Sequence, residues 1–246
     1  MCITDIYMKN KSSNNSSANT KGERLFEQYL KKQRYNFEYE ALKGKTKPDY
    51  LVDTPLGQII CEIEDIVKSP KLQLGKGTVI RDSRHKKIQD KINNARKHFR
   101  PYKDCKLPCV LIIYNHSIMQ DIQDMEGKSI DPNHYREIED IQYAMEGEST
   151  TVVRVPTNPN HGQIEVICNY FGEKGSMTYR KEGKGGIQNR TISAVGLIDK
   201  PQSGIPRIRL VHNRHATVAL SSNIFCDSLD EQYAADKNSM TFKKIN

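Results

Sequence analysis

The sequence contains one uninterrupted apolar run, Leu-Pro-Cys-Val-Leu-Ile-Ile-Tyr at residues 107–114. Side chains alternate between the two faces of a strand, so a strand that is apolar at every position is buried on both faces. Such a strand lies within a sheet that other elements cover on each side. The run therefore predicts a layered α/β protein with a central strand at these residues.

Two segments that precede this run have the periodicity of amphipathic helices. Thr20 and Glu23 have the spacing of a capping box, which predicts a helix over residues 21–34. The apolar positions of this helix are Leu25, Phe26, Tyr29 and Leu30. Residues 82–99 predict a second helix, which ends before Pro101 and is mostly basic away from its apolar face. The apolar positions of that helix are Ile88, Ile92, Ala95 and Phe99.

The other segments are predicted mainly as strands. The first half of the chain has strand candidates at residues 36–41, 50–52 and 58–63, and Pro55 and Gly57 are placed to reverse the chain between the last two. The second half has a helix candidate at residues 132–146 and strand candidates at 152–155, 163–170, 191–198 and 208–211. A stretch rich in Gly and Lys at residues 172–189 predicts a long loop.

These elements predict three parts of the chain. Residues 1–20, rich in Ser and Asn, read as a disordered leader. Residues 21–115 form the α/β core, and residues 116–246 form a β-rich extension that packs on the core and can continue its sheet. The sequence has neither an apolar span of about 20 residues nor a secretory signal, so we expect a cytosolic protein without a membrane segment. Its six cysteines include no Cys-x-x-Cys pair, which disfavours a structural zinc site.

Positive charge is concentrated in one part of the chain. The formal net charge is +8, and residues 21–107 hold 21 Lys and Arg against 12 Asp and Glu. The densest stretch, residues 76–106, has eleven basic and three acidic residues. A field of this kind attracts a polyanion, and nucleic acid is the expected partner. The alternative is a basic helix face that only contacts water.

An acidic cluster is predicted on the hairpin around Pro55. If Asp53 pairs with Gln58 in a regular antiparallel ladder, Asp49 faces Glu62, and Glu64 projects on the same face as Glu62. Opposed side chains on one face have Cβ atoms about 4.5–5.5 Å apart, close enough for carboxylates to share a divalent cation. In the same register Lys47 faces Glu64, so an ion pair between these two residues is the rival explanation for that glutamate.

The motif Pro48-Asp49 followed by Glu62-Ile63-Glu64, after one helix and before a basic helix and an apolar strand, resembles the PD-(D/E)XK nuclease superfamily. The resemblance covers residues 21–115 and implies a restriction-endonuclease-like core, in which helices flank a mixed central sheet. It implies that Asp49 and Glu62 bind metal and that Glu27, on the first helix, is a further acid. Glu64 stands where the superfamily usually has a lysine that helps to activate water. Lys47 or Lys68 is a candidate for the missing cation.

The resemblance also implies that the second helix contacts the nucleic acid backbone. The candidate phosphate ligands on that helix are Arg84, Lys87, Lys91 and Lys97. His98 is a weaker candidate for the site, at the end of the same helix. His212 and His215 form a compact pair, but on a strand they would point to opposite faces, which favours structural or partner-binding roles.

The leading functional hypothesis is hydrolysis of phosphodiester bonds in DNA, or in RNA, with Mg²⁺ or Mn²⁺ held by Asp49, Glu62 and Glu64. The alternative is an inactive nuclease-like module that binds nucleic acid or another protein, which the absence of the motif lysine favours. A homodimer is compatible with either hypothesis.

Overall fold

The structure is a computed structural model. It describes residues 18–42, 46–66, 84–115, 122–123, 129–130, 138, 140–142, 144–145, 147–154, 165–174, 178–181, 184–200, 204–235 and 242–245. Most of the predicted leader and Lys68 lie outside these residues.

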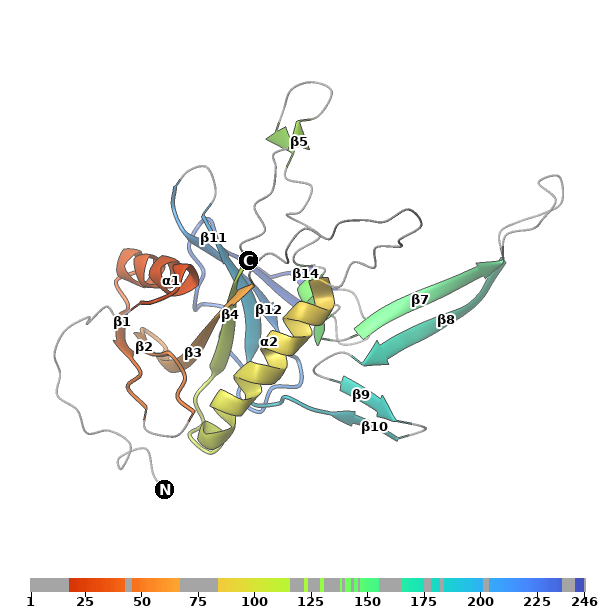
Figure 1. Ribbon diagram of the computed structural model, residues 1–246, viewed down its shortest axis with the longest axis horizontal. Helices are drawn as coiled ribbons and strands as arrows, with labels where there is room; N and C mark the ends of the chain where they lie inside the picture. The colour runs from red at the N-terminus through yellow and green to blue at the C-terminus, as the bar shows by residue number, and fades with distance from the viewer. Residues whose placement is uncertain are drawn as a thin grey trace, which may run out of the picture.

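One eight-stranded mixed sheet forms the centre of the molecule (Figure 1). In spatial order its strands are β1 (Asn36–Tyr39), β2 (Tyr50–Thr54), β3 (Gly57–Ile66), β4 (Cys109–Asn115), β11 (Ala194–Asp199), β12 (Arg207–His212), β13 (Glu231–Ala235) and β14 (Phe242–Lys244). The strand β4 runs parallel to both β3 and β11, whereas β1, β2 and β3 are antiparallel neighbours. The sequence prediction of an α/β protein with a mixed sheet is therefore confirmed, and the C-terminal strands continue the same sheet.

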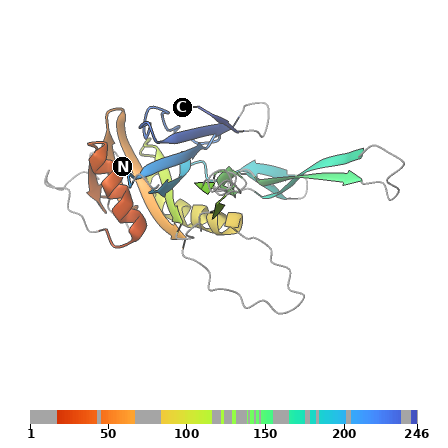
Figure 2. The same ribbon diagram turned by 90° about the horizontal axis from the view of Figure 1, so that it is seen from above.

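Helices lie on the two faces of this sheet. The helix α1 (Lys21–Lys32) and the helix α2 (Arg84–Phe99) lie on opposite sides of β3 (Figure 2). The apolar side chains divide accordingly. On β4, Val110 and Ile112 pack in the cluster that contains α1, and Leu111 and Ile113 pack in the cluster that contains α2. The predicted central strand is thus buried on both faces, for the reason that its composition indicates.

The start of α1 packs very closely on the sheet. The predicted capping box is present, because Glu23 N–H donates to Thr20 Oγ1 and the Glu23 carboxylate accepts from Thr20 N–H. A Cβ atom on Gly22 would lie 2.3 Å from Asp65 Oδ1 and 2.9 Å from Tyr114 Cβ. Glycine therefore permits the helix to approach β3 and β4 at this point.

Residues near the C-terminal end of the chain complete the core around α1. Phe225 makes edge-to-face contacts with Phe26 and Tyr29. The hydroxyl of Tyr29 donates a hydrogen bond of 2.5 Å to Asp230 Oδ2, across 201 residues of sequence. Segments from the two ends of the chain thus share one core.

The hairpin β2–β3 has the register that the sequence predicts. Asp53 pairs with Gln58, and the ladder extends to Tyr50 and Cys61. Gly57 has a φ of +115°, a conformation that L side chains rarely adopt, so glycine suits this turn. The strand β3 continues past the end of the ladder to Ile66 and pairs there with β4.

The middle of the chain contains strands outside this sheet. Three hairpins are formed by β5 (Ile122–Gln123) and β6 (Ser129–Ile130), β7 (Gly147–Arg154) and β8 (Glu165–Lys174), and β9 (Thr178–Lys181) and β10 (Lys184–Ile187). The long loop predicted for residues 172–189 is therefore wrong. Backbone pairing in a two-stranded ribbon needs few apolar side chains, so the composition of this stretch concealed it. Figures 1 and 2 show that the β7–β8 ribbon projects from the main sheet.

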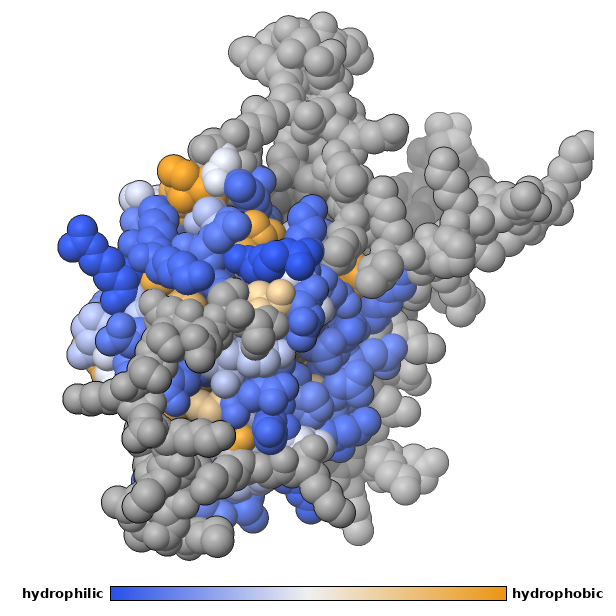
Figure 3. Space-filling view, turned by 60° about the vertical axis from the view of Figure 1, so that its left-hand side comes forward, coloured by the Kyte–Doolittle hydropathy of each residue, from blue (hydrophilic) through white to orange (hydrophobic). Residues whose placement is uncertain are grey.

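The described residues also include two short helical segments outside α1 and α2. A short 3-10 helix, η2 (Arg100–Tyr102), follows α2, with Pro101 near its start. Residues 138, 140–142 and 144–145 are helical, as predicted for that region, and Ile141 and Met145 are fully buried. The described part of the face drawn in Figure 3 is mainly hydrophilic. None of the described helices has both the length and the apolar composition required to cross a membrane.

Candidate functional site

The candidate site lies where β2 ends and β3 continues alone toward α2. Asp49 immediately precedes β2, and its Oδ2 accepts a hydrogen bond of 2.7 Å from the N–H of Ile63. The carboxylate thereby occupies the position at which a further residue of β2 would pair with β3. Asp49 is held beside β3 by this bond, one residue away from Glu62.

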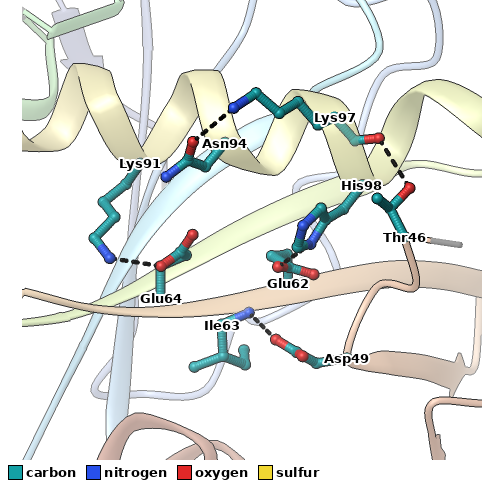
Figure 4. A network of polar contacts seen from close by, with 9 residues as sticks. All are labelled: Thr46, Asp49, Glu62, Ile63, Glu64, Lys91, Asn94, Lys97 and His98. Carbon is teal, nitrogen blue, oxygen red and sulfur yellow. Dashed lines mark hydrogen bonds and ion pairs between the residues drawn. The ribbon is translucent and has the colours of Figure 1, made fainter.

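Two glutamates of β3 project from the strand toward α2. Glu62 Oε1 lies 2.5 Å from Nδ1 of His98, and Glu64 Oε2 accepts a bond of 2.6 Å from Nζ of Lys91. Figure 4 shows both glutamates directed toward α2, whereas Asp49 is directed toward the main-chain nitrogen of Ile63. The contacts follow from the alternation of side chains on β3, because Glu62 and Glu64 share the face that α2 covers.

Burial and mutual repulsion hold Glu62 and Asp49 toward their neutral forms. Burial, with the charges of Asp49 and Glu64, raises the pKa of Glu62 from 4.5 to about 9. Burial also raises the pKa of Asp49 from 3.8 to about 7, against the hydrogen bond from Ile63 and with the charges of Glu23 and Glu64. The three acids of the motif therefore lie close enough to influence one another.

Glu62 has an oxygen that the described protein does not satisfy. The residue is only 3 % exposed, and its Oε2 is buried without a hydrogen-bond partner among the residues that the structure describes. A buried carboxylate oxygen of this kind is costly unless it is protonated or bound to a cation. The raised pKa of Glu62 favours the protonated form when no cation is present.

The helix α1 supplies an acid to the site, but this acid is Glu23 and not the predicted Glu27. Glu27, the predicted further acid, accepts hydrogen bonds from Lys31 and Tyr50. Glu23 is an α1 residue whose charge helps to raise the pKa of both Asp49 and Glu62. The sequence marks Glu23 only as part of the capping box, since its proximity to the hairpin depends on how α1 docks.

The ion pair between Lys47 and Glu64, the rival explanation for that glutamate, is not the pairing found in the structure. Lys47 Nζ lies 3.6 Å from Glu40, and Lys91 is the partner of Glu64. The prediction extended the ladder of β2 to residue 47, but β2 begins at Tyr50, so Lys47 has no register with β3. The cation beside the motif comes from α2, where Lys91 was expected to contact phosphate.

The three carboxylates do not form a ready ligand set. Within the described ranges, no group of three or more His, Cys, Asp or Glu side chains is placed to hold a metal ion. The predicted convergence of Asp49, Glu62 and Glu64 on one point is thus not found, because His98 and Lys91 draw the two glutamates toward α2 and Ile63 holds Asp49.

The other predicted phosphate ligands occupy α2. Lys97 is exposed, and its Nζ donates to Asn94 Oδ1 at 3.2 Å. Its carbonyl accepts from the hydroxyl of Thr46, which ties α2 to the segment before β2. Lys87 is half-buried and has a polar contact. The side chain of Arg84 lies outside the described residues.

The histidines near the end of β12 are separate from this site. Nε2 of His212 lies 2.7 Å from Gln232 Oε1, and burial lowers the pKa of His212. The amide of Gln232 donates to the carbonyls of Ser222, Ile224 and Phe225. His212 thus belongs to a network that holds the segment before β13, and His215 contacts Arg214.

Comparison of the chain with protein-family models, with curated proteins and with solved structures found no match. The function of the candidate site must therefore be inferred from the chemistry of its own residues.

Proposed function

We propose that this protein is a Mg²⁺-dependent nuclease that hydrolyses phosphodiester bonds, with Asp49 and Glu62 as the metal-binding acids. The observation that carries the proposal is the buried Oε2 of Glu62, which has no hydrogen-bond partner among the described residues, beside the half-buried carboxyl group of Asp49. A divalent cation is the ligand that best stabilises two neighbouring carboxylates removed from water. Mn²⁺ prefers similar oxygen ligands and is the natural substitute in experiments.

The residues present fit such an ion in part. Glu62 offers Oε2, and Asp49, which uses Oδ2 for the N–H of Ile63, offers Oδ1. Mg²⁺ commonly binds one or two carboxylates and keeps several waters, so two protein ligands are sufficient. Glu64 would act as a third ligand only after it leaves Lys91.

The proposed chemistry assigns a task to each side chain. A bound Mg²⁺ would lower the pKa of a water molecule and stabilise charge on the leaving oxygen. Asp49 and Glu62 would position that ion at the end of β2. Lys91 provides positive charge next to Glu64, the position where the superfamily usually has a lysine, and the ion pair of 2.6 Å fixes its ammonium group over β3.

The order of elements supports a restriction-endonuclease-like core. Along the chain, α1 is followed by the antiparallel strands β1, β2 and β3, then by α2 and by the parallel strand β4. This is the order that the resemblance implies, and it brings a basic helix over the acidic strand. DNA is therefore the first substrate to test, and RNA the second.

A cleavage assay tests the proposal directly. Double-stranded DNA, single-stranded DNA and RNA are incubated with the full chain in Mg²⁺, in Mn²⁺ and in EDTA. We expect metal-dependent cleavage, and we expect Asp49→Asn and Glu62→Gln to reduce it by more than the roughly 10–100-fold that loss of an outer-shell partner costs. Asp53→Asn is the matched control, since Asp53 is an exposed acid on the same hairpin.

One observation favours a second function. The pairing of Glu64 with Lys91 neutralises this acid without a metal, as expected for a nuclease-like module that binds nucleic acid but does not cut it. Salt-sensitive binding of DNA or RNA that is the same in Mg²⁺ and EDTA, with no cleavage of any substrate, would establish this alternative and exclude the nuclease.

A further inference from the structure

His98 is the side chain of α2 that contacts Glu62. It lies in the last turn of α2, between the fully buried residues Ala95 and Phe99, so the backbone of this turn is held against the sheet. From there Nδ1 reaches Glu62 Oε1 at 2.5 Å (Figure 4). The two residues are 36 positions apart in sequence, so the contact depends on the docking of α2 on β3.

The contact distinguishes the two oxygens of Glu62. Oε1 is occupied by His98, and Oε2 is buried with no partner in the described part of the chain. A glutamate side chain has several rotamers, and the contact with the stiff ring of His98 restricts them, together with a hydrogen bond from the backbone of Asp49 that lowers the pKa of Glu62. A carboxylate that binds a cation through Oε2 is ionised, so Nδ1–H must then be the donor and Oε1 the acceptor.

We propose that His98 is a positioning residue that holds Glu62 through Oε1 and thereby presents Oε2 to a divalent cation. The proposal rests on the proposed function, because it assigns His98 a role at the same site. Lys91 has no such role for Glu62, since its ammonium group is engaged by Glu64. Outer-shell partners of metal-binding carboxylates orient them in this way, and their loss weakens metal binding by about 10–100-fold.

Mn²⁺ binding to the full chain, measured by electron paramagnetic resonance, tests this role without an activity assay. The binding that Glu62→Gln abolishes defines the site. His98→Leu keeps much of the bulk of the ring but has no N–H, whereas His98→Asn keeps a side-chain N–H donor. Asn93→Ala, at an exposed position of α2, is the control. Thermal unfolding of each variant shows whether it is folded.

We expect His98→Leu to weaken Mn²⁺ binding by about 10–100-fold. We expect His98→Asn and Asn93→Ala to stay within a few-fold of the wild type. If the wild type has no Mn²⁺ binding that depends on Glu62, both this inference and the proposed function are wrong. If that binding exists but His98→Leu leaves it unchanged, or His98→Asn loses as much as His98→Leu, only the role of His98 is wrong.

Discussion

Glu62 combines two properties that rarely occur together in a stable protein. Its side chain is almost entirely removed from water, and two other acids, Asp49 and Glu64, lie close enough for their negative charge to raise its pKa. The cost of ionising such a group is large, so the proton stays bound at pH values where an exposed glutamate has lost it. The site can therefore exist in two forms, protonated without a cation and ionised with one.

This property makes the stability of the cation-free protein depend on pH. The pKa of Glu62 is raised from 4.5 to about 9, so between these values the folded chain binds a proton that the unfolded chain releases. The free energy of unfolding must then fall as pH rises through that range. We expect Tm in EDTA to fall between pH 5 and pH 9 by more than about 2–4 °C, the shift that 1 kcal/mol produces in a domain of this size.

Thermal unfolding in EDTA at a series of pH values measures this effect, with Glu62→Gln as the comparison. The variant has no proton to release at this position, so its Tm should change less over the same range. Addition of Mg²⁺ should raise the Tm of the wild type more at pH 9 than at pH 5, because the cation competes with the proton. Equal pH dependence in the two proteins would contradict the pKa assigned to Glu62.

At the scale of elements, the first turn of α1 packs on β3 and β4 so that no room is left for a side chain at residue 22. Gly22 permits this contact, since a methyl group there would meet Asp65 and Tyr114. Alanine has the higher helix propensity, by about 1 kcal/mol, so Gly22→Ala would stabilise α1 if the helix were isolated. In the folded protein we expect the reverse, a loss of about 1–3 kcal/mol from overpacking.

Urea unfolding of Gly22→Ala, with Gln28→Ala on the exposed side of α1 as the control, measures the difference. The control should be unchanged or slightly stabilised, since it adds a good helix former without a contact. A Gly22→Ala variant as stable as the wild type would show that Asp65 and Tyr114 move apart at little cost.

The sequence predicts local elements well and contacts between them poorly. The capping box at Thr20, the β2–β3 register and the buried strand β4 depend on neighbouring residues, and all three are present. The partners of Glu62 and Glu64 come from α2, 36 and 27 residues away. Helical periodicity shows which face of α2 is apolar, but not which strand residues its flanks reach. The sequence therefore makes His98 only a weaker candidate for the site, and it does not predict the pairing of Lys91 with Glu64.

At the scale of the whole molecule, the basic and the slightly acidic parts of the sequence contain different parts of the main sheet. Residues 21–107 hold the positive excess and include α1, α2 and the β1–β3 part of the sheet, although many of the basic residues lie outside the described ranges. Residues 108–246 have 15 basic and 17 acidic residues and build β4 and the other part of the sheet. We therefore expect a polyanion to bind to the part of the chain that contains the candidate site.

The salt dependence of DNA binding tests this arrangement. If Lys87 and Lys97 each contact a phosphate, their joint replacement by alanine should reduce the slope of log K against log salt by about 0.9 for each lost contact on duplex DNA. Lys244→Ala is the control, since Lys244 pairs with Glu231 at the far edge of the sheet. Fluorescence anisotropy at several salt concentrations gives the slopes. An unchanged slope in the double variant would show that neither lysine contacts a phosphate.

The contact of Tyr29 with Phe225 and Asp230 also determines when the protein can fold on the ribosome. Tyr29 and Asp230 are 201 residues apart in the sequence. At about 5–20 residues per second, the ribosome needs roughly 10–40 s to translate that stretch. During that interval the apolar side of α1 has no Phe225 to cover it and is available to chaperones or to other nascent chains. Translation interrupted before Phe225 would thus release an aggregation-prone fragment, because α1 lacks partners that are synthesised roughly 200 residues later.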